Sequence, residues 1–90
     1  MQILVVEDEK RLAEALQQLL SEKKYMVDLA FDGMDGLNMA LSGIYDVIVL
    51  DVMLPKMNGL QVVSELRKQK IETPILMLTA KDQVLSLIHI

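Results

Sequence analysis

Val47-Ile48-Val49-Leu50-Asp51 is the stretch that decides the fold, because it places a carboxylate directly after four consecutive apolar residues. The run contains no alternating polar residues, and this pattern is typical of a strand covered on both faces, as in a parallel sheet flanked by helices. Two comparable runs occupy residues 3–6, which lead into Glu7-Asp8, and residues 75–78, which lead into Thr79. If the three runs are neighbouring parallel strands, their polar ends meet at the edge where open α/β sheets bind ligands.

The segments between these runs predict helices and one further strand. Leucines and alanines recur at helical spacing in residues 10–23, and residues 26–30 form another short strand-like run. Asp32-Gly33 begins a short helix, and residues 59–69 predict another. We therefore expect three strand–helix units and a fourth strand, with right-handed crossovers and the strand order 2-1-3-4. The fold class is α/β, with a parallel sheet between two layers of helices.

Local signals indicate where two of the helices begin. Asn58 is a favourable N-cap, and Gln61, three positions further on, can complete a capping box. Asp8 is a favourable N-cap for the helix over residues 10–23, and Glu9 is then expected to be a solvated residue of its first turn.

Composition restricts the class of protein. A chain of 90 residues suits one small domain, and its apolar stretches of four to five residues are far shorter than a membrane span. It contains no cysteine, which excludes a disulfide framework and a thiolate metal site and fits a reducing compartment. Its first residues do not resemble a signal peptide. The net charge of −4 argues against direct nucleic acid binding by this segment.

Asp51 is the leading candidate for chemistry. A single aspartate at a strand end usually initiates a turn by bonding to nearby backbone. Here Glu7, Asp8 and Thr79 occupy the matching ends of the other strands, which favours a shared site. A carboxylate can attack phosphorus and form an aspartyl phosphate, and a cation is needed to neutralise the phosphoryl oxygens during transfer.

The other acidic residues suit a hard divalent cation. Glu7 and Asp8 could simply favour the N-terminus of the helix that follows them. Mg²⁺, however, binds oxygen ligands and keeps several waters. A plausible set is Asp8 and Asp51 directly, Glu7 through water, and the backbone carbonyl of Met53. Thr79 could be an ordinary β-branched strand residue, or its hydroxyl could bond a phosphoryl oxygen on Asp51.

Three motifs, in this order, resemble the receiver domain of bacterial two-component response regulators. They are Leu-Val-Val-Glu7-Asp8-Glu, Asp46-Val-Ile-Val-Leu-Asp51-Val-Met-Leu-Pro55-Lys-Met-Asn58-Gly59 and Thr73-Pro74-Ile-Leu-Met-Leu-Thr79-Ala80-Lys-Asp82. The resemblance covers residues 1–82 and implies a flavodoxin-like fold.

The resemblance also implies a phosphoacceptor signalling module that is not an enzyme. Asp51 would accept a phosphoryl group from the phosphohistidine of a sensor histidine kinase, with Mg²⁺ held by Asp8, Asp51 and a backbone carbonyl. Thr79 would report phosphorylation through its hydroxyl. The motifs are closest to receivers that precede a winged-helix DNA-binding domain, which implies a cytoplasmic transcription regulator as the parent protein.

The chain departs from the resemblance after residue 82. A complete receiver continues with a fifth strand that ends in a lysine, an aromatic switch residue and a last helix. We instead expect a receiver domain over residues 1–82, truncated before the fifth strand, and an atypical apolar tail over residues 83–90. Loss of the lysine predicts impaired phosphorylation and signal output, which Lys81, just beyond Thr79, could partly offset.

Two other functions stay open. A sheet that ends at residues 75–78 would have an uncovered apolar edge, and such edges pair with other chains. We therefore expect a homodimer or higher self-association through this edge and residues 84–90, and the chain could be an inert interaction fragment that keeps only the fold and the metal site.

An Mg²⁺-dependent phosphohydrolase would also use an aspartate nucleophile, but Val52 and Met53 provide no second acid beside Asp51.

Overall fold

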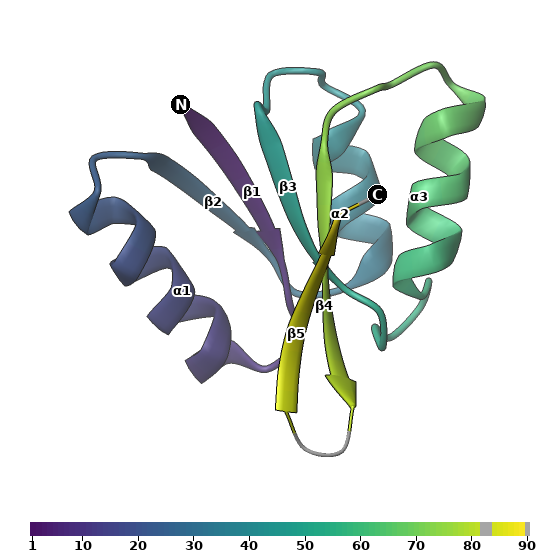
Figure 1. The fold of residues 1–90 in the computed structure, drawn as a ribbon. Coiled ribbons are helices and arrows are strands. Elements are labelled where there is room, and N and C mark those ends of the chain that lie inside the picture. Colours follow the sequence, from purple (N-terminus) through teal and green to yellow (C-terminus); the bar gives the residue numbers. More distant parts are fainter. Residues whose placement is uncertain (82–83, 90) are drawn as a thin grey trace.

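The computed structural model describes the backbone of residues 1–81 and 84–89, and the side chains up to residue 78. A central sheet separates α1 (Lys10–Glu22) on one face from α2 (Gly33–Ala40) and α3 (Gly59–Lys68) on the other (Figure 1). No helix in this described part of the chain is both long enough and apolar enough to cross a membrane. The strands are β1 (Gln2–Val6), β2 (Met26–Ala30), β3 (Val47–Asp51), β4 (Ile75–Lys81) and β5 (Val84–His89).

The sheet confirms the predicted order of the first four strands. Its full order is β2-β1-β3-β4-β5, and β1 to β4 pair in parallel. The chain moves outward from β1 to β2 and then returns to the other side of β1, so the direction of winding reverses between β1 and β3. At this point the loops that follow the two strands diverge to opposite faces of the sheet, which leaves room for a ligand between them.

β5 corrects the expectation that the outer edge of β4 is uncovered. The two strands pair antiparallel, with Leu76 opposite His89 and Lys81 opposite Val84. Only residues 82–83 separate them, and so short a connection permits an antiparallel hairpin but no parallel crossover. The sheet therefore has five strands, and its outer edge is β5. The proposed division between residues 1–82 and 83–90 stays a prediction.

The hydrophobic core lies between the sheet and the layer formed by α2 and α3. Leu4, Ile48 and Leu50 of the two central strands are at most 1% exposed, as are Val62 and Leu66 of α3. These residues belong to one continuous cluster, which fixes α3 against β3 and β4. The packing holds the carboxyl ends of the central strands in place, and those ends carry the candidate site.

The helix caps confirm one sequence prediction and correct another. The Asn58 side chain accepts a hydrogen bond from the Gln61 N–H at 2.9 Å, and the Gln61 side chain accepts one from the Asn58 N–H at 3.0 Å. This is the predicted capping box. The N-cap of α1, however, is Glu9, whose carboxylate accepts from the Leu12 N–H at 2.9 Å. The expectation that Asp8 is the N-cap of this helix is therefore wrong.

Candidate metal centre

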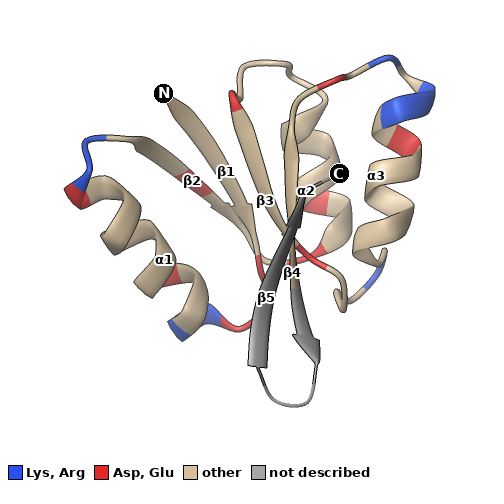
Figure 2. Cartoon of the chain, viewed as in Figure 1, with Lys and Arg blue, Asp and Glu red and all other residues tan. Residues whose placement is uncertain are grey.

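Three carboxylates meet at the carboxyl edge of the sheet. Glu7 and Asp8 follow β1 directly, and Asp51 is the last residue of β3. Val6 is paired with Leu50 in the parallel register, so the ends of β1 and β3 lie side by side. One carboxylate oxygen from each of the three side chains lies within 4.8 Å of the other two. Figure 2 shows acidic residues at this edge, where β1 and β3 end.

Glu7 is the buried member of the cluster. Its side chain accepts a hydrogen bond from the Glu9 N–H at 2.8 Å, and the residue is only 4% exposed. Burial raises the pKa of Glu7 from 4.5 to about 7, and the nearby charge of Asp51 acts in the same direction, whereas the hydrogen bond from Glu9 lowers it. Carboxylates held this close repel one another, so a cation placed between them stabilises the arrangement.

The loop that follows β3 orients the Asp51 carboxylate. The Met53 N–H donates to Asp51 Oδ1 at 3.1 Å, and the Gly59 N–H donates to the Val52 carbonyl at 2.9 Å. A Cβ atom at Gly59 would lie 2.3 Å from the Asp51 carbonyl oxygen, so only glycine permits this close approach. Sequence reasoning assigned no role to Gly59, although a glycine directly after a helix cap was the available signal.

The donor set fits Mg²⁺. Carboxylate and carbonyl oxygens are its usual protein ligands, and the ligands of an octahedral ion at ~2.0–2.1 Å are at most about 4.2 Å apart. The spacing of the three carboxylates requires only small side-chain adjustments to reach that geometry. Asp8 and Asp51 are more exposed than Glu7, so direct contacts from Asp8 and Asp51 leave room for water ligands.

The remaining predicted residues stand as follows. Thr79 lies in β4, one residue beyond Leu78, which is paired with Asp51. Its backbone is therefore at the same edge of the sheet, and its side chain lies outside the described residues, as does that of Lys81. Met53 lies in the loop after β3 with its side chain 80% exposed, and the role of its carbonyl stays a prediction.

Comparisons with known proteins agree with this geometry. Residues 3–89 match the family model of the response regulator receiver domain. The chain is 59% identical over 83 residues to the transcriptional regulatory protein DltR of Streptococcus agalactiae and 51% identical over 81 residues to the response regulator ArlR of Staphylococcus aureus. These matches cover 92% and 90% of the chain, but only 37% and 36% of the two relatives.

Solved structures show the same fold. The receiver domain of the Francisella response regulator 1452 superposes with a TM-score of 0.85 at 37% identity, over 90% of this chain and 67% of that one. The response regulator TrrA of Thermotoga maritima, solved in complex with Mg²⁺–BeF, gives 0.82 at 41% identity, over 89% and 70%. The predicted flavodoxin-like fold is confirmed. On the family match, the fold and these relatives, the chain belongs to the response regulator receiver domain family.

Proposed function

We propose that this receiver domain is a phosphoacceptor that carries a transient phosphoryl group on Asp51. The observation that carries the proposal is the convergence of Glu7, Asp8 and Asp51 within 4.8 Å at the carboxyl edge of the sheet. A lone strand-end aspartate has no means of neutralising an incoming phosphoryl group, whereas this cluster can hold a divalent cation beside the nucleophile.

The chemistry is a transfer from nitrogen to oxygen. An oxygen of the Asp51 carboxylate attacks phosphorus, the bond between phosphorus and the donor imidazole nitrogen breaks, and that nitrogen takes a proton as it leaves. Asp8 and Asp51, with Glu7 through water and the Met53 carbonyl, would hold Mg²⁺. The cation, when bound, neutralises charge on the transferring phosphoryl oxygens. The Met53 N–H holds Asp51 Oδ1, so Oδ2 is the proposed attacking oxygen.

The donor and the response belong to the same proposal. A sensor histidine kinase is the proposed source of the phosphoryl group, and the proposed parent protein is a cytoplasmic transcription regulator, as the name of one relative suggests. The Thr79 hydroxyl is proposed to contact the phosphoryl group, because its backbone lies at the same edge of the sheet as Asp51. Direct nucleic acid binding and turnover of a separate substrate are not part of the proposed role.

Treatment with a small acyl phosphate and Mg²⁺ tests the proposal. We expect the intact protein to gain the mass of one phosphoryl group, and we expect chelation of Mg²⁺ to abolish the gain. Asp51→Asn should remove it, because the amide cannot form the acyl phosphate. Glu14→Gln is the matched control, since Glu14 is an exposed acid of α1 and should leave the gain unchanged.

The outcome separates the proposal from an inert fragment. A wild-type protein that binds Mg²⁺ but gains no mass would be an interaction fragment that retains the fold and the metal site only. Mass gain that persists in Asp51→Asn would place the phosphoryl group on another residue.

We also propose that copies of this chain associate along β5. β5 is the outermost strand of the sheet, and its sequence, Val84 to His89, contains no lysine, aspartate or glutamate to prevent edge pairing. A second copy can add its own β5 antiparallel around a two-fold axis, which satisfies the outward backbone groups of both strands. This proposal replaces the expected contact through the edge of β4.

A further inference from the structure

The first residues of the loop over residues 52–58 are hydrogen-bonded to the candidate metal site. Its Met53 N–H binds the Asp51 carboxylate, and its Val52 carbonyl accepts from Gly59 at the start of α3. The same loop supplies the Met53 carbonyl that is proposed as a metal ligand. The conformation of the loop therefore decides where one candidate ligand lies and how the nucleophile is oriented.

The far half of the loop contacts the first turn of α2. The Gly33 N–H donates to the Pro55 carbonyl at 3.2 Å. A Cβ atom at Gly33 would lie 1.7 Å from the Met57 carbonyl oxygen, so the loop and the helix approach each other as closely as a glycine allows. The loop after β3 and the helix after β2 are therefore joined by direct backbone contact.

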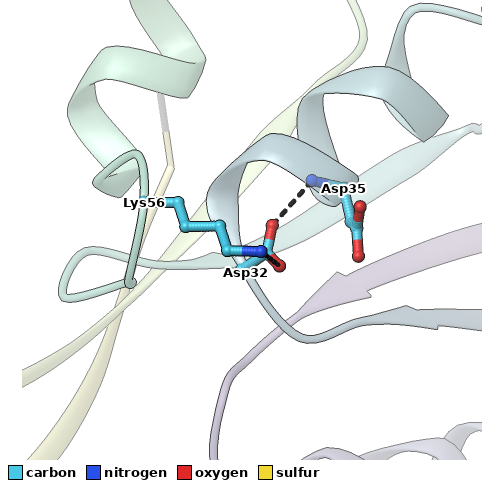
Figure 3. A network of polar contacts seen from close by, with 3 residues as sticks. All are labelled: Asp32, Asp35 and Lys56. Atoms are coloured by element: carbon cyan, nitrogen blue, oxygen red, sulfur yellow. Dashed lines mark hydrogen bonds and ion pairs between the residues drawn. The ribbon is translucent and has the colours of Figure 1, made fainter.

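An ion pair lies across this contact. Lys56 Nζ is 3.5 Å from Asp32 Oδ2, and Asp32 Oδ1 accepts from the Asp35 N–H at 2.8 Å (Figure 3). Asp32 thus caps α2 with Oδ1 and pairs with Lys56 of the loop through Oδ2. The Asp32 side chain is 14% exposed, against 69% for Lys56. The hydrogen bond from Asp35 lowers the pKa of Asp32, and Lys56 contributes in the same direction, so this carboxylate is charged at neutral pH.

The Lys56 backbone adopts a conformation that a lysine does not favour. Its φ is 68°, and the Met57 N–H donates to the Pro55 carbonyl at 2.8 Å across it. A three-residue turn with positive φ at its centre is rare and strained. A glycine would adopt it without cost from the side chain, so a glycine at this position removes the ion pair while keeping the backbone conformation accessible.

We infer that Asp32 and Lys56 are positioning residues for the metal site, because their ion pair holds the loop over residues 52–58 in the conformation that presents the Met53 carbonyl and the Asp51 carboxylate to the cation. The inference rests on the proposed binding of Mg²⁺. Neither residue touches the cation, and both act through the loop. If the loop is correctly placed for only a fraction of the time, the apparent association constant for the cation is multiplied by that fraction.

Lys56→Gly tests whether Lys56 acts through its charge alone or by positioning the loop, because the two explanations predict opposite changes in Mg²⁺ affinity. The variant removes the ammonium group and relieves the backbone conformation. If Lys56 acts only as a positive charge near an acidic cluster, its loss should tighten Mg²⁺ binding. If it positions the loop, calorimetric titration should show binding weakened about two- to fivefold, the effect expected of an exposed ion pair. Lys56→Arg should restore the wild-type affinity, because it keeps the charge.

Asp32→Asn completes the test. The amide oxygen can still accept the Asp35 N–H and cap α2, so the variant removes the charge and keeps the cap. We expect a similar two- to fivefold loss of affinity, and we expect the double variant to lose no more than either single variant, because both break one ion pair. Losses that add, or a Lys56→Gly variant that binds Mg²⁺ as tightly as wild type, would overturn the inference.

The chain provides matched controls. Lys24 and Lys70 also have positive φ, of 67° and 63°, and lie in the loops at the opposite edge of the sheet. Lys24→Gly and Lys70→Gly should leave Mg²⁺ affinity unchanged.

At saturating Mg²⁺, Lys56→Gly should be phosphorylated at the wild-type rate, and it should be slower only below saturation. A rate deficit that persists at saturation would argue against a positioning role.

Amide hydrogen exchange measured without metal tests this inference separately from the proposed function. In the presence of a chelator, the Met57 amide hydrogen should exchange faster in Lys56→Gly than in wild type or Lys24→Gly. Unchanged exchange would show that the ion pair does not hold the loop and would overturn the inference alone. Absence of Mg²⁺ binding by the wild-type protein would overturn the proposed function and the inference together.

Discussion

At the scale of single residues, Tyr45, a buried member of the core cluster, links β2 to the segment that precedes β3. Its hydroxyl donates to Asp28 Oδ2 at 2.6 Å, and the residue is 7% exposed. Asp28 lies in β2 and Tyr45 just before β3, so the bond spans β1, which lies between them. Burial raises the pKa of Tyr45 to about 12, and the hydrogen bond and charge of Asp28 act in the same direction.

Tyr45→Phe should lower the free energy of unfolding by about 0.5–1.5 kcal/mol at pH 7, the usual contribution of one hydrogen bond. The stabilisation should depend on pH with a definite sign. A phenol whose pKa is higher in the folded state favours folding fully below pH 10, its value in the unfolded chain, and loses that effect as pH rises toward about 12. Urea unfolding should show the two proteins converging over this range. Tyr25→Phe is the control, because Tyr25 is 36% exposed.

The three residues of the acidic cluster were predictable from the sequence. The cap of α1 and the ion pair between Asp32 and Lys56, which lie around the cluster, were not. Glu7, Asp8 and Asp51 each follow an apolar run, and parallel pairing then brings them together. The choice of Glu9 over Asp8 as the cap of α1 could not be made from sequence, because both side chains are acceptors and only the path of the chain after β1 decides between them. The pairing of Asp32 with Lys56 joins two loops that are distant in sequence, so no local pattern indicates it.

At the scale of elements, helices and strands with strong local signals were predictable. The Asn58 capping box fixes the start of α3, and the continuous apolar runs fix β1, β3 and β4. β5 was missed because the expectation of a parallel strand after a helix does not apply to a connection of two residues. That strand is also the element at which the proposed self-association can be tested.

Leu85→Lys should convert a concentration-dependent dimer into a monomer. A charge on an edge strand opposes pairing with a second edge because pairing would remove the ammonium group from water. Sedimentation over a range of concentrations measures the change, and circular dichroism checks that the fold is retained. Leu19→Lys is the control, since Leu19 is 60% exposed on α1, and it should leave the dimer intact. A wild-type protein that is monomeric at every concentration would contradict the proposal.

At the scale of the whole molecule, the acidic cluster proposed to bind Mg²⁺ opposes stability when no cation is bound. The carboxylates proposed as ligands repel one another, and the buried position of Glu7 increases the cost of its charge. A domain of this size is only marginally stable, so the balance between repulsion and cation binding should be visible in the unfolding of the entire chain. Stability and metal affinity are therefore linked through Asp51.

Asp51→Asn should have opposite effects on thermal unfolding with and without Mg²⁺. In a chelator, the variant should have a higher Tm than wild type, because it removes the charge of Asp51 from the acidic cluster and its amide oxygen can still accept the Met53 N–H. Mg²⁺ at about 100 times its Kd should stabilise the wild-type protein by about 2.7 kcal/mol, and each kcal/mol raises the Tm of such a domain by about 4–8 °C. The variant should show little of this increase.

Scanning calorimetry measures both effects, and Glu14→Gln should follow wild type in each condition. A wild-type Tm that does not respond to Mg²⁺ would contradict the link, because a cation that binds only the folded state must stabilise it.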